Sequence, residues 1–440
     1  MREHSSYFRG LVYSRWKKHY FVYEAVIFRK TQDQYALEAR SRNKKGDRQA
    51  MEIATLIVVG MVIVTALMFD FTNGFHDTAN AMATSIATGA LKPKTAVIAA
   101  GTLNLIGAFL STEVAKTISG GIINEQQVTI GAEFIFAGLV GAIIWNLLTW
   151  LVGLPSSSSH ALFGGLVGAV IVGAGVEGVN FFAVLTKVLI PALVSPLVAG
   201  LAAWVAVRLI LLIVRKMSAD KVDSGFRHGQ TITACLVALS HGTNDAQKTM
   251  GIITLTLIAV GAQASGTGPQ LWVIAACGLA IAFGTYAGGW RVIRTLGKGL
   301  TEISTPQGFA AEAASATTIL VSSHLGFALS TTQVCSGSII GSGLGKKGSK
   351  VNWGVAGKML IAWLVTFPAA GIVGACACAV AKISLAGTIG VGVAALVIAG
   401  IIFRLSRRNP VNSLNVNDSH EVKVTPTKPT NNNSTMAQAA

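Results

Sequence analysis

The sequence is poor in charge: only 12% of its 440 residues are Asp, Glu, Lys or Arg, whereas 52% are hydrophobic and the mean hydropathy is +0.58. Soluble globular domains carry about 25% charged residues, so this composition excludes one. Apolar stretches long enough to cross a bilayer as a helix, roughly 20 residues each, recur along most of the chain. The 48 glycines suit helices that pack closely in lipid. The expected class is an all-α polytopic membrane protein.

Cysteine is also scarce, with five in the chain. Cys376 and Cys378 are separated by one residue, which is not a C-x-x-C motif, and no histidine accompanies them at metal-ligand spacing. We therefore expect small buried thiols, no protein-bound metal and no cofactor.

Residues 1–50 lack the apolar core of a signal peptide and contain twelve Lys or Arg against five Asp or Glu. We interpret them as a basic polar extension, or as the product of a start codon assigned upstream of Met51. The remaining basic excess lies in short connections between apolar segments, which is typical of loops that face anionic lipid. The net charge of +16 therefore indicates membrane lipid as a partner and not nucleic acid.

Two motifs recur in the same order, which predicts an internal duplication. HDTAN at 76–80 is echoed by NDAQK at 244–248, and the run from Gly153 to Gly168 is echoed by the run from Gly326 to Gly341. About ten to twelve membrane segments are expected, with 230–245 and 247–262 as separate segments. The predicted organisation is a first transporter repeat at 51–215, a basic connecting loop at 216–229, a second repeat at 230–404 and a disordered polar tail at 405–440.

The duplicated motif places carboxylates inside membrane segments. On a helix, Asp77 and Asn80 share one face, and Asp245 and Lys248 share another. Intramembrane carboxylates are costly and usually mark an ion path or face a polar cavity. A simple hydrogen-bonded contact between helices is the alternative, but it does not explain why the carboxylate is duplicated.

Two hydroxyl runs, PSSSSH at 155–160 and LSTTQ at 329–333, each precede a glycine-rich apolar segment. Hydroxyls before a helix cap its N-terminus, where free N–H groups and the helix dipole favour an anion. We expect one re-entrant helical hairpin per repeat at these runs, as in transporters built from inverted repeats. Two ordinary hydroxyl-rich loops remain the alternative. His160 and Gln333 take matching places after the runs, which favours a position in the site lining.

Hydroxyls and amide N–H groups suit an oxyanion, while the two aspartates require a cation or proton beside it. Cation-coupled anion uptake is the predicted function. An intramembrane hydrolase using Ser159 and His160 is disfavoured because no G-x-S-x-G motif occurs and the polar groups are duplicated. Sulfate is disfavoured because it has no proton to donate to Asp77 or Asp245 at neutral pH. A passive channel stays open.

The stretches GFHDTANA, SHGTNDAQKTMG, LPSSSSHA, LSTTQ and QGFAAEAASATTILVSS together resemble the PiT-type inorganic phosphate transporters, in their bacterial low-affinity branch, over roughly residues 51–404. The resemblance implies a multi-pass plasma-membrane symporter that imports inorganic phosphate, built from two inverted repeats; a homodimer is left open. It implies substrate contacts from Asp77, Asn80, Ser156, Ser157, Ser158, Ser159, Asn244, Asp245, Lys248, Ser330, Thr331 and Thr332. It implies coupling-ion contacts from His76, Asp77, Thr78, Asp245, Gln247 and Glu312.

Two departures from the commoner family pattern concern the coupling ion. His76 replaces an asparagine, and Lys248 replaces the asparagine three residues after the second aspartate. A fixed ammonium supplies the charge that Na⁺ would otherwise bring, and histidine titrates near neutral pH. H⁺ is therefore predicted over Na⁺, with a divalent metal as a co-substrate in a neutral metal–phosphate complex left open. Asp70 is left between a supporting and an interfacial role, and His241 between a structural and a ligand role.

Overall fold

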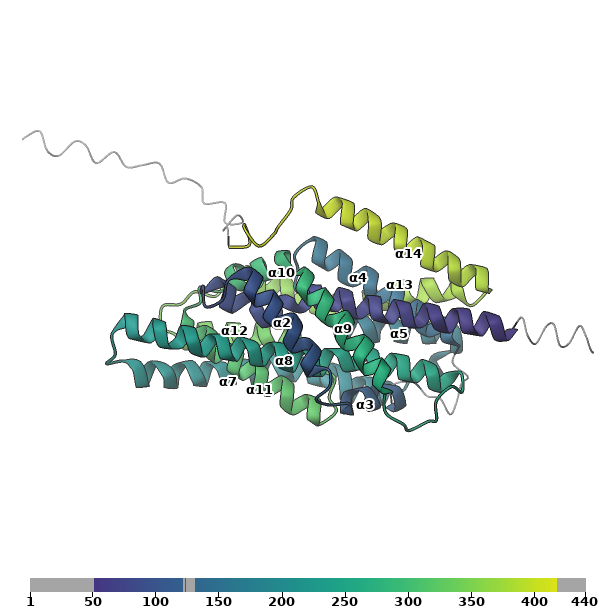
Figure 1. The fold of residues 1–440 in the computed structure, drawn as a ribbon, viewed down its shortest axis with the longest axis horizontal. Helices are drawn as coiled ribbons and strands as arrows, with labels where there is room; N and C mark the ends of the chain where they lie inside the picture. The colour runs from purple at the N-terminus through teal and green to yellow at the C-terminus, as the bar shows by residue number, and fades with distance from the viewer. Residues whose placement is uncertain (1–50, 122, 124–130, 418–440) are drawn as a thin grey trace, which may run out of the picture. The chain divides into compact units, whose positions relative to one another are not determined.

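The computed structural model describes residues 51–121, 123 and 131–417. Helices are the regular elements of the described residues, joined by turns and loops with two isolated bridges, Ile123 with Val179 and Thr301 with Val351, which confirms the all-α class (Figure 1). The chain divides after Ile57 into two units, and all contacts given below lie within the second. The helices are the first helix Met51–Ala87, α2 Pro93–Gly107, α3 Glu113–Gly121, α4 Ala132–Leu151, α5 Ser158–Ala174, α6 Phe181–Val184, α7 Ile190–Val214, α8 Ala219–Ala259, α9 Leu271–Ala287, α10 Trp290–Arg294, α11 Thr305–His324, α12 Thr331–Gly345, α13 Trp353–Ala381 and α14 Leu385–Ser406, with short 3₁₀ and π turns at Val176–Gly178, Leu185–Leu189 and Thr295–Gly299.

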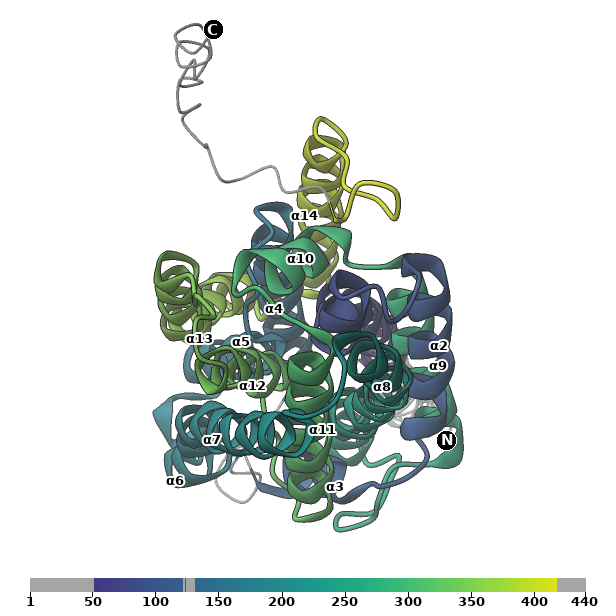
Figure 2. The same ribbon diagram turned by 90° about the vertical axis from the view of Figure 1, so that its left-hand side faces the viewer.

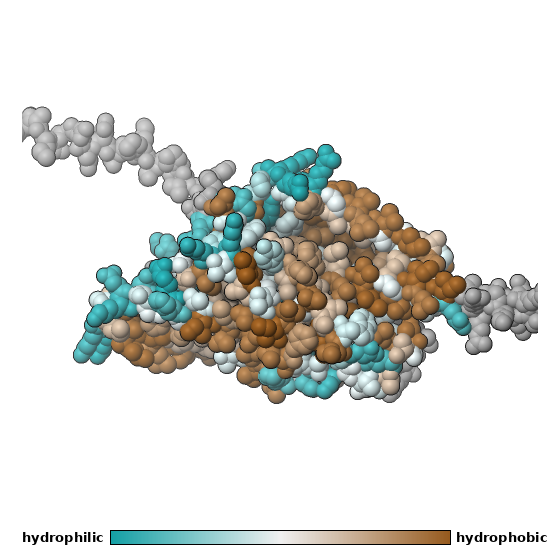
Figure 3. Space-filling view, viewed as in Figure 1, coloured by the Kyte–Doolittle hydropathy of each residue, from teal (hydrophilic) through white to brown (hydrophobic). Residues whose placement is uncertain are grey.

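Among the described residues, five helices are long and apolar enough to cross a membrane, or six if the bent pair Leu271–Ala287 and Trp290–Gly299 is one broken span. The five are Met51–Ala87, Ala132–Leu151, Phe181–Val214, Trp353–Ala381 and Leu385–Ser406. Figure 3 shows apolar residues over most of the face drawn, with polar residues at its left end, at its top and along its lower edge. The larger predicted number of membrane segments includes helices that are too short or too polar for this criterion.

Three predicted boundaries are wrong, and two of them concern α8. The segments 230–245 and 247–262 are parts of one helix of 41 residues, which continues through its polar centre because the side chains there find buried partners. The predicted loop 216–229 is helical from Ala219 onward, since charged residues are compatible with an exposed helix end. There Arg227 donates to Asp223 at 2.8 Å and, with a hydrogen bond from Thr305, lowers the pKa of the Asp223 carboxyl.

The third boundary is the polar tail predicted from residue 405. The chain stays in contact with the rest of the structure beyond the end of α14, because two arginines donate to its backbone carbonyls. Arg291 donates to Ser406, the last residue of α14, at 2.7 Å and to Asn409 at 2.6 Å. Arg294 donates to Asn415 at 2.6 Å. Val416 is buried. Residues 418–440 of the predicted tail, and the predicted extension at 1–50, lie outside the described residues.

Two pairs of helices approach closely through glycine: α5 with α13, and α7 with α12 (Figure 2). A Cβ on these glycines would collide with the facing backbone, so only glycine allows the approach. The facing positions are Gly164 with Phe367, Gly168 with Gly371, Gly337 with Pro196, and Gly341 with Gly200. The same contact thus occurs twice, each time between a helix after a hydroxyl run and a helix of the other predicted repeat. The inverted relation of the repeats stays a prediction.

The first helix and α8 run antiparallel through the polar centre. Thr249 of α8 donates to Asp70 at 2.6 Å, and at the other end Thr88 donates to Gln230 at 2.8 Å. Since Asp77 and Asp245 lie between these contacts, the packing of the two helices brings the duplicated carboxylates together.

Candidate functional site

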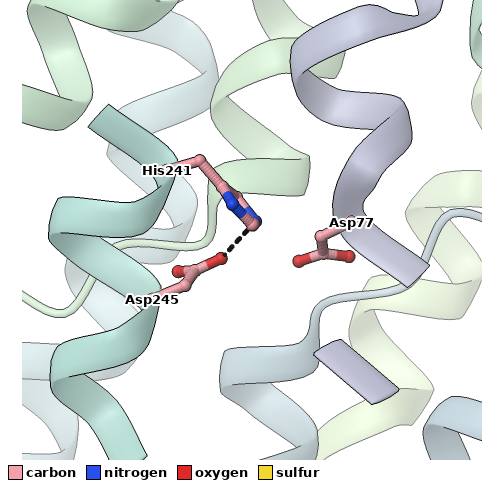
Figure 4. Close-up of side chains that lie close together, drawn as sticks. All are labelled: Asp77, His241 and Asp245. Carbon is pink, nitrogen blue, oxygen red and sulfur yellow. Dashed lines mark ion pairs between the residues drawn. The ribbon is translucent and has the colours of Figure 1, made fainter. Parts of the chain in front are cut away.

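Asp77 on the first helix faces Asp245 on α8, and the imidazole of His241 lies between them (Figure 4). One ligand atom from each of the three residues lies within 4.8 Å of the others, and all three side chains are buried. His241 Nε2 is 2.9 Å from Asp245 Oδ2. Two carboxylates this close in a buried place favour a cation or a proton between them.

Lys248 supplies a fixed positive charge at the same place. Its ammonium forms an ion pair with Asp245 Oδ1 and donates to Ser159 Oγ at 2.6 Å and to the Leu329 carbonyl at 2.9 Å. Asn244 also donates to Asp245 Oδ1 and to the Leu329 carbonyl, both at 3.0 Å. Lys248 therefore joins α8 to the chain that enters α5 and to the chain that enters α12.

The hydroxyl runs begin helices, as predicted. Ser157 caps α5 by accepting from the His160 N–H at 3.2 Å, and Ser330 caps α12 by accepting from the Gln333 N–H at 3.4 Å. Both helix N-termini, with their favourable potential for anions, thus enter the region of the paired aspartates.

Threonines at the start of α12 connect the two aspartates. Thr331 donates to Asp245 Oδ2 at 3.0 Å and lies 3.4 Å from Asp77 Oδ2, while Thr332 lies 3.4 Å from Asp77 Oδ1. Asn80 donates to the Thr332 hydroxyl at 3.0 Å. The structure therefore places these predicted substrate residues in one cluster.

His76 gives Asp77 an imidazole of its own. Its Nδ1 is 2.6 Å from Asp77 Oδ1, and its Nε2 is 3.4 Å from the hydroxyls of Thr149 and Ser156. Each aspartate of the pair thus has one histidine at ion-pair distance. Thr149, which the sequence interpretation missed, lies seven residues before Ser156 and carries no motif that would have singled it out.

Several predicted residues point elsewhere. The Gln247 side chain accepts from the N–H groups of Val114 and Ala115 at 2.8 and 3.2 Å, so it caps α3. Thr78 donates to the Gly74 carbonyl at 2.6 Å, and the buried Ser158 hydroxyl has no hydrogen-bond partner among the described residues. His160 and Gln333 line an apolar cavity of about 880 Å³ bounded by α7, α12 and α13.

Glu312 occupies a separate polar place on α11. Its carboxylate accepts from Thr84 at 2.5 Å, from Thr233 at 2.7 Å and from Gln230 at 3.1 Å. Because Thr84 follows Asp77 by two helical turns, Glu312 lies about 10 Å further along the first helix than the aspartate pair.

Polytopic helices, two helix N-termini and a buried cluster of polar side chains with an ammonium define a membrane transport protein for an oxyanion. A sequence profile described as the phosphate transporter family matches residues 73–222 and 215–374. The chain belongs to the phosphate transporter family. This confirms the resemblance, the multi-pass location in the plasma membrane and the expectation of a transporter of inorganic phosphate that is not an enzyme.

Relatives and a solved structure agree with this assignment. The chain is 55% identical over 374 residues to a probable low-affinity inorganic phosphate transporter of Mycobacterium tuberculosis. The matched residues make up 84% of this chain and 89% of the relative. It is 41% identical over 322 residues to a protein of the same name from Bacillus subtilis, covering 73% and 96%. A solved structure titled as a sodium-dependent phosphate transporter superposes with a TM-score of 0.66 at 24% identity, covering 73% of this chain and 98% of that one, and shows the fold alone.

Proposed function

We propose that the chain imports inorganic phosphate in symport with protons, and that Asp77, Asn80, Asp245, Lys248 and the hydroxyls at the starts of α5 and α12 bind the phosphate. The observation that carries the choice of proton is the set of nitrogens around the aspartates. His76 and His241 lie 2.6 and 2.9 Å from their carboxylates, and Lys248 already places a fixed cation against Asp245. Imidazoles exchange protons near neutral pH, whereas a sodium ion needs oxygen ligands that these groups replace.

Reconstituted transporter in liposomes tests this function. Uptake of radiolabelled phosphate is measured with a pH gradient at equal Na⁺ on both sides, and with a Na⁺ gradient at equal pH. We expect accumulation with the pH gradient alone, and weak competition by sulfate, which has no proton to donate to a carboxylate.

The variant Lys248→Asn sharpens the test because it removes the fixed ammonium. We expect this variant to lose accumulation driven by the pH gradient. If the parent and the variant both require Na⁺ and ignore the pH gradient, proton coupling is wrong and the sodium symporter is the better assignment. Saturable sulfate uptake without phosphate uptake would refute the substrate as well.

A neutral metal–phosphate complex is a second candidate for the transported species. Asp77, His241 and Asp245 offer two carboxylates and an imidazole within 4.8 Å, a ligand set that suits a divalent cation. The metal would enter as co-substrate. Phosphate-dependent uptake of radiolabelled Ca²⁺ or Mn²⁺ in the same liposomes, abolished in His241→Ala, would support it; phosphate uptake that is unchanged by chelators would contradict it.

A further inference from the structure

Asp70 is a carboxyl group buried in the membrane part of the first helix that the phosphate site does not use. Its side chain has no exposed surface, Thr249 donates to Oδ1 at 2.6 Å, and Oδ2 accepts no hydrogen bond from the described residues. The Cys277 thiol of α9 is its other polar neighbour. Among the described residues no cation forms an ion pair with this carboxyl, and the bond from Thr249 is the one that an oxygen or nitrogen donor makes to it; an ionised carboxylate needs more than this when buried, whereas the neutral acid does not.

Asp70 also lies next to the aspartate pair. It precedes Asp77 by seven residues, or about 10 Å along the helix, and its partner Thr249 lies one turn beyond Asp245 on the same face of α8. The charged groups of α8 that act on it are Asp245 and Lys248. Since Lys248 is bound to Asp245, Ser159 and the Leu329 carbonyl, it forms no ion pair with Asp70.

We infer that Asp70 is a proton-binding site of the transport cycle, which holds the transported proton beside the phosphate site. The carboxyl is neutral while the proton is bound and becomes a carboxylate as the proton leaves to solvent water, so each turn of this step moves one positive charge. The inference rests on the proposed proton coupling and adds a residue outside the phosphate site. It gives a role to the Asp70 carboxyl, which forms no ion pair among the described residues although it lies beside a site that already contains the carboxylates of Asp77 and Asp245.

The variant Asp70→Asn tests the inference, because the amide is neutral, has the same shape and can still accept from Thr249. Two measurements are made in liposomes: exchange of labelled for unlabelled phosphate at equal pH, which needs no net proton movement, and accumulation driven by a pH gradient. A gradient of one unit supports up to about tenfold accumulation per coupled proton. Asp220→Asn, at the exposed start of α8, is the matched control and should behave as the parent in both assays.

We expect Asp70→Asn to exchange phosphate at about the parent's rate and to lose accumulation, so that the internal phosphate only equals the external. Accumulation equal to that of the parent would overturn the inference. Loss of exchange in a folded variant would also overturn it, since the carboxyl would then be needed for phosphate movement. If the parent accumulates phosphate only with Na⁺, the proposed coupling fails, which is a different result from either of these.

A second variant covers the case in which Asp70→Asn does not fold. Thr249→Val removes the hydroxyl that holds Asp70, while Thr249→Ser keeps it. We expect Thr249→Val to shift the pH at which accumulation is half-maximal and Thr249→Ser to restore the parent's profile. Identical pH profiles for the parent and both variants would contradict a proton-binding role for Asp70.

Discussion

Removing the buried ammonium of Lys248 tests the balance of charge at the site. Lys248 is almost fully buried, and its ammonium is the one lysine or arginine cation that pairs with Asp245 among the described residues. In Lys248→Met the Asp245 carboxylate keeps hydrogen bonds from Thr331 and Asn244, both at 3.0 Å, and keeps His241 Nε2 at 2.9 Å, but it loses its ion pair with the fixed ammonium. Removal of one partner from a buried pair typically costs about 3–5 kcal/mol of stability.

A double-mutant cycle separates this penalty from the loss of packing. Asp245→Asn added to Lys248→Met removes the unpaired charge and should recover at least about 2 kcal/mol, because apolar or neutral replacement of a whole buried pair is often nearly neutral. The single variant should therefore be less stable than the double variant, although we expect neither to transport phosphate.

The unfolding temperature of each variant in the cycle is measured in detergent. Unfolding is monitored by the labelling of the buried thiols of Cys277, Cys335 and Cys378 as they become exposed. Lys358→Met, at an exposed position of α13, is the matched control and should unfold as the parent does. If the double variant unfolds at the same temperature as Lys248→Met or below it, Asp245 does not carry a charge that Lys248 balances, and the electrostatic description of the site is wrong.

Three further predictions concern other parts of the structure. Thr331→Val removes a hydroxyl that donates to Asp245 at 3.0 Å and that we expect to donate to the bound phosphate. Because a hydrogen bond to a charged group is worth about 1.5–3 kcal/mol, the variant should weaken phosphate affinity about tenfold or more in equilibrium binding; unchanged affinity would place the substrate elsewhere. Gly341→Val should lower the unfolding temperature, because overpacking costs about 1–3 kcal/mol and a Cβ would meet the backbone of α7, whereas Gly390→Val has open space and should not. Arg291→Ala removes one hydrogen bond to Ser406 at the end of α14 and one to Asn409 beyond it, and should increase protease cleavage at residues 407–417; equal cleavage in the parent would show that these bonds do not hold the segment.

Helical spacing explains much of what the sequence could and could not predict about α8. At 100° per residue, Asp245 and Lys248 share a face, as the structure confirms, and His241 lies one turn before Asp245 on that face. The imidazole was therefore available to the same argument, although its position opposite Asp77 depends on how the two helices pack. Gln247 is about 200° around the helix from Asp245, so helical spacing alone places it on the opposite face, away from the aspartates, although it belongs to the same sequence motif. The contact of its side chain with α3 depends on the packing of the helices.

The hydroxyl runs were predictable because capping is a local property: Ser157 and Ser330 each bond to an N–H three residues later. Which helix each capped helix packs against was not predictable. The glycines of α5 and α12 indicate that another helix approaches closely, but not which one. That α5 packs against α13 and α12 against α7 depends on contacts between residues more than 130 positions apart. Residues 219–229 are helical although the sequence predicts a loop there, because a run of charged residues is compatible with either an exposed loop or an exposed helix end.

The hydrogen bonds of α12 suggest how proton and phosphate binding would depend on one another. A threonine hydroxyl has a single proton to donate, and that of Thr331 is directed to Asp245. A protonated Asp245 no longer needs this bond and has a proton of its own to donate, so the Thr331 hydroxyl becomes available to a phosphate oxygen. Protonation then adds two donors and removes one negative charge at the place where the anion binds. Under the proposed proton coupling, each ligand would therefore favour binding of the other, and this mutual dependence is the property that a symporter requires.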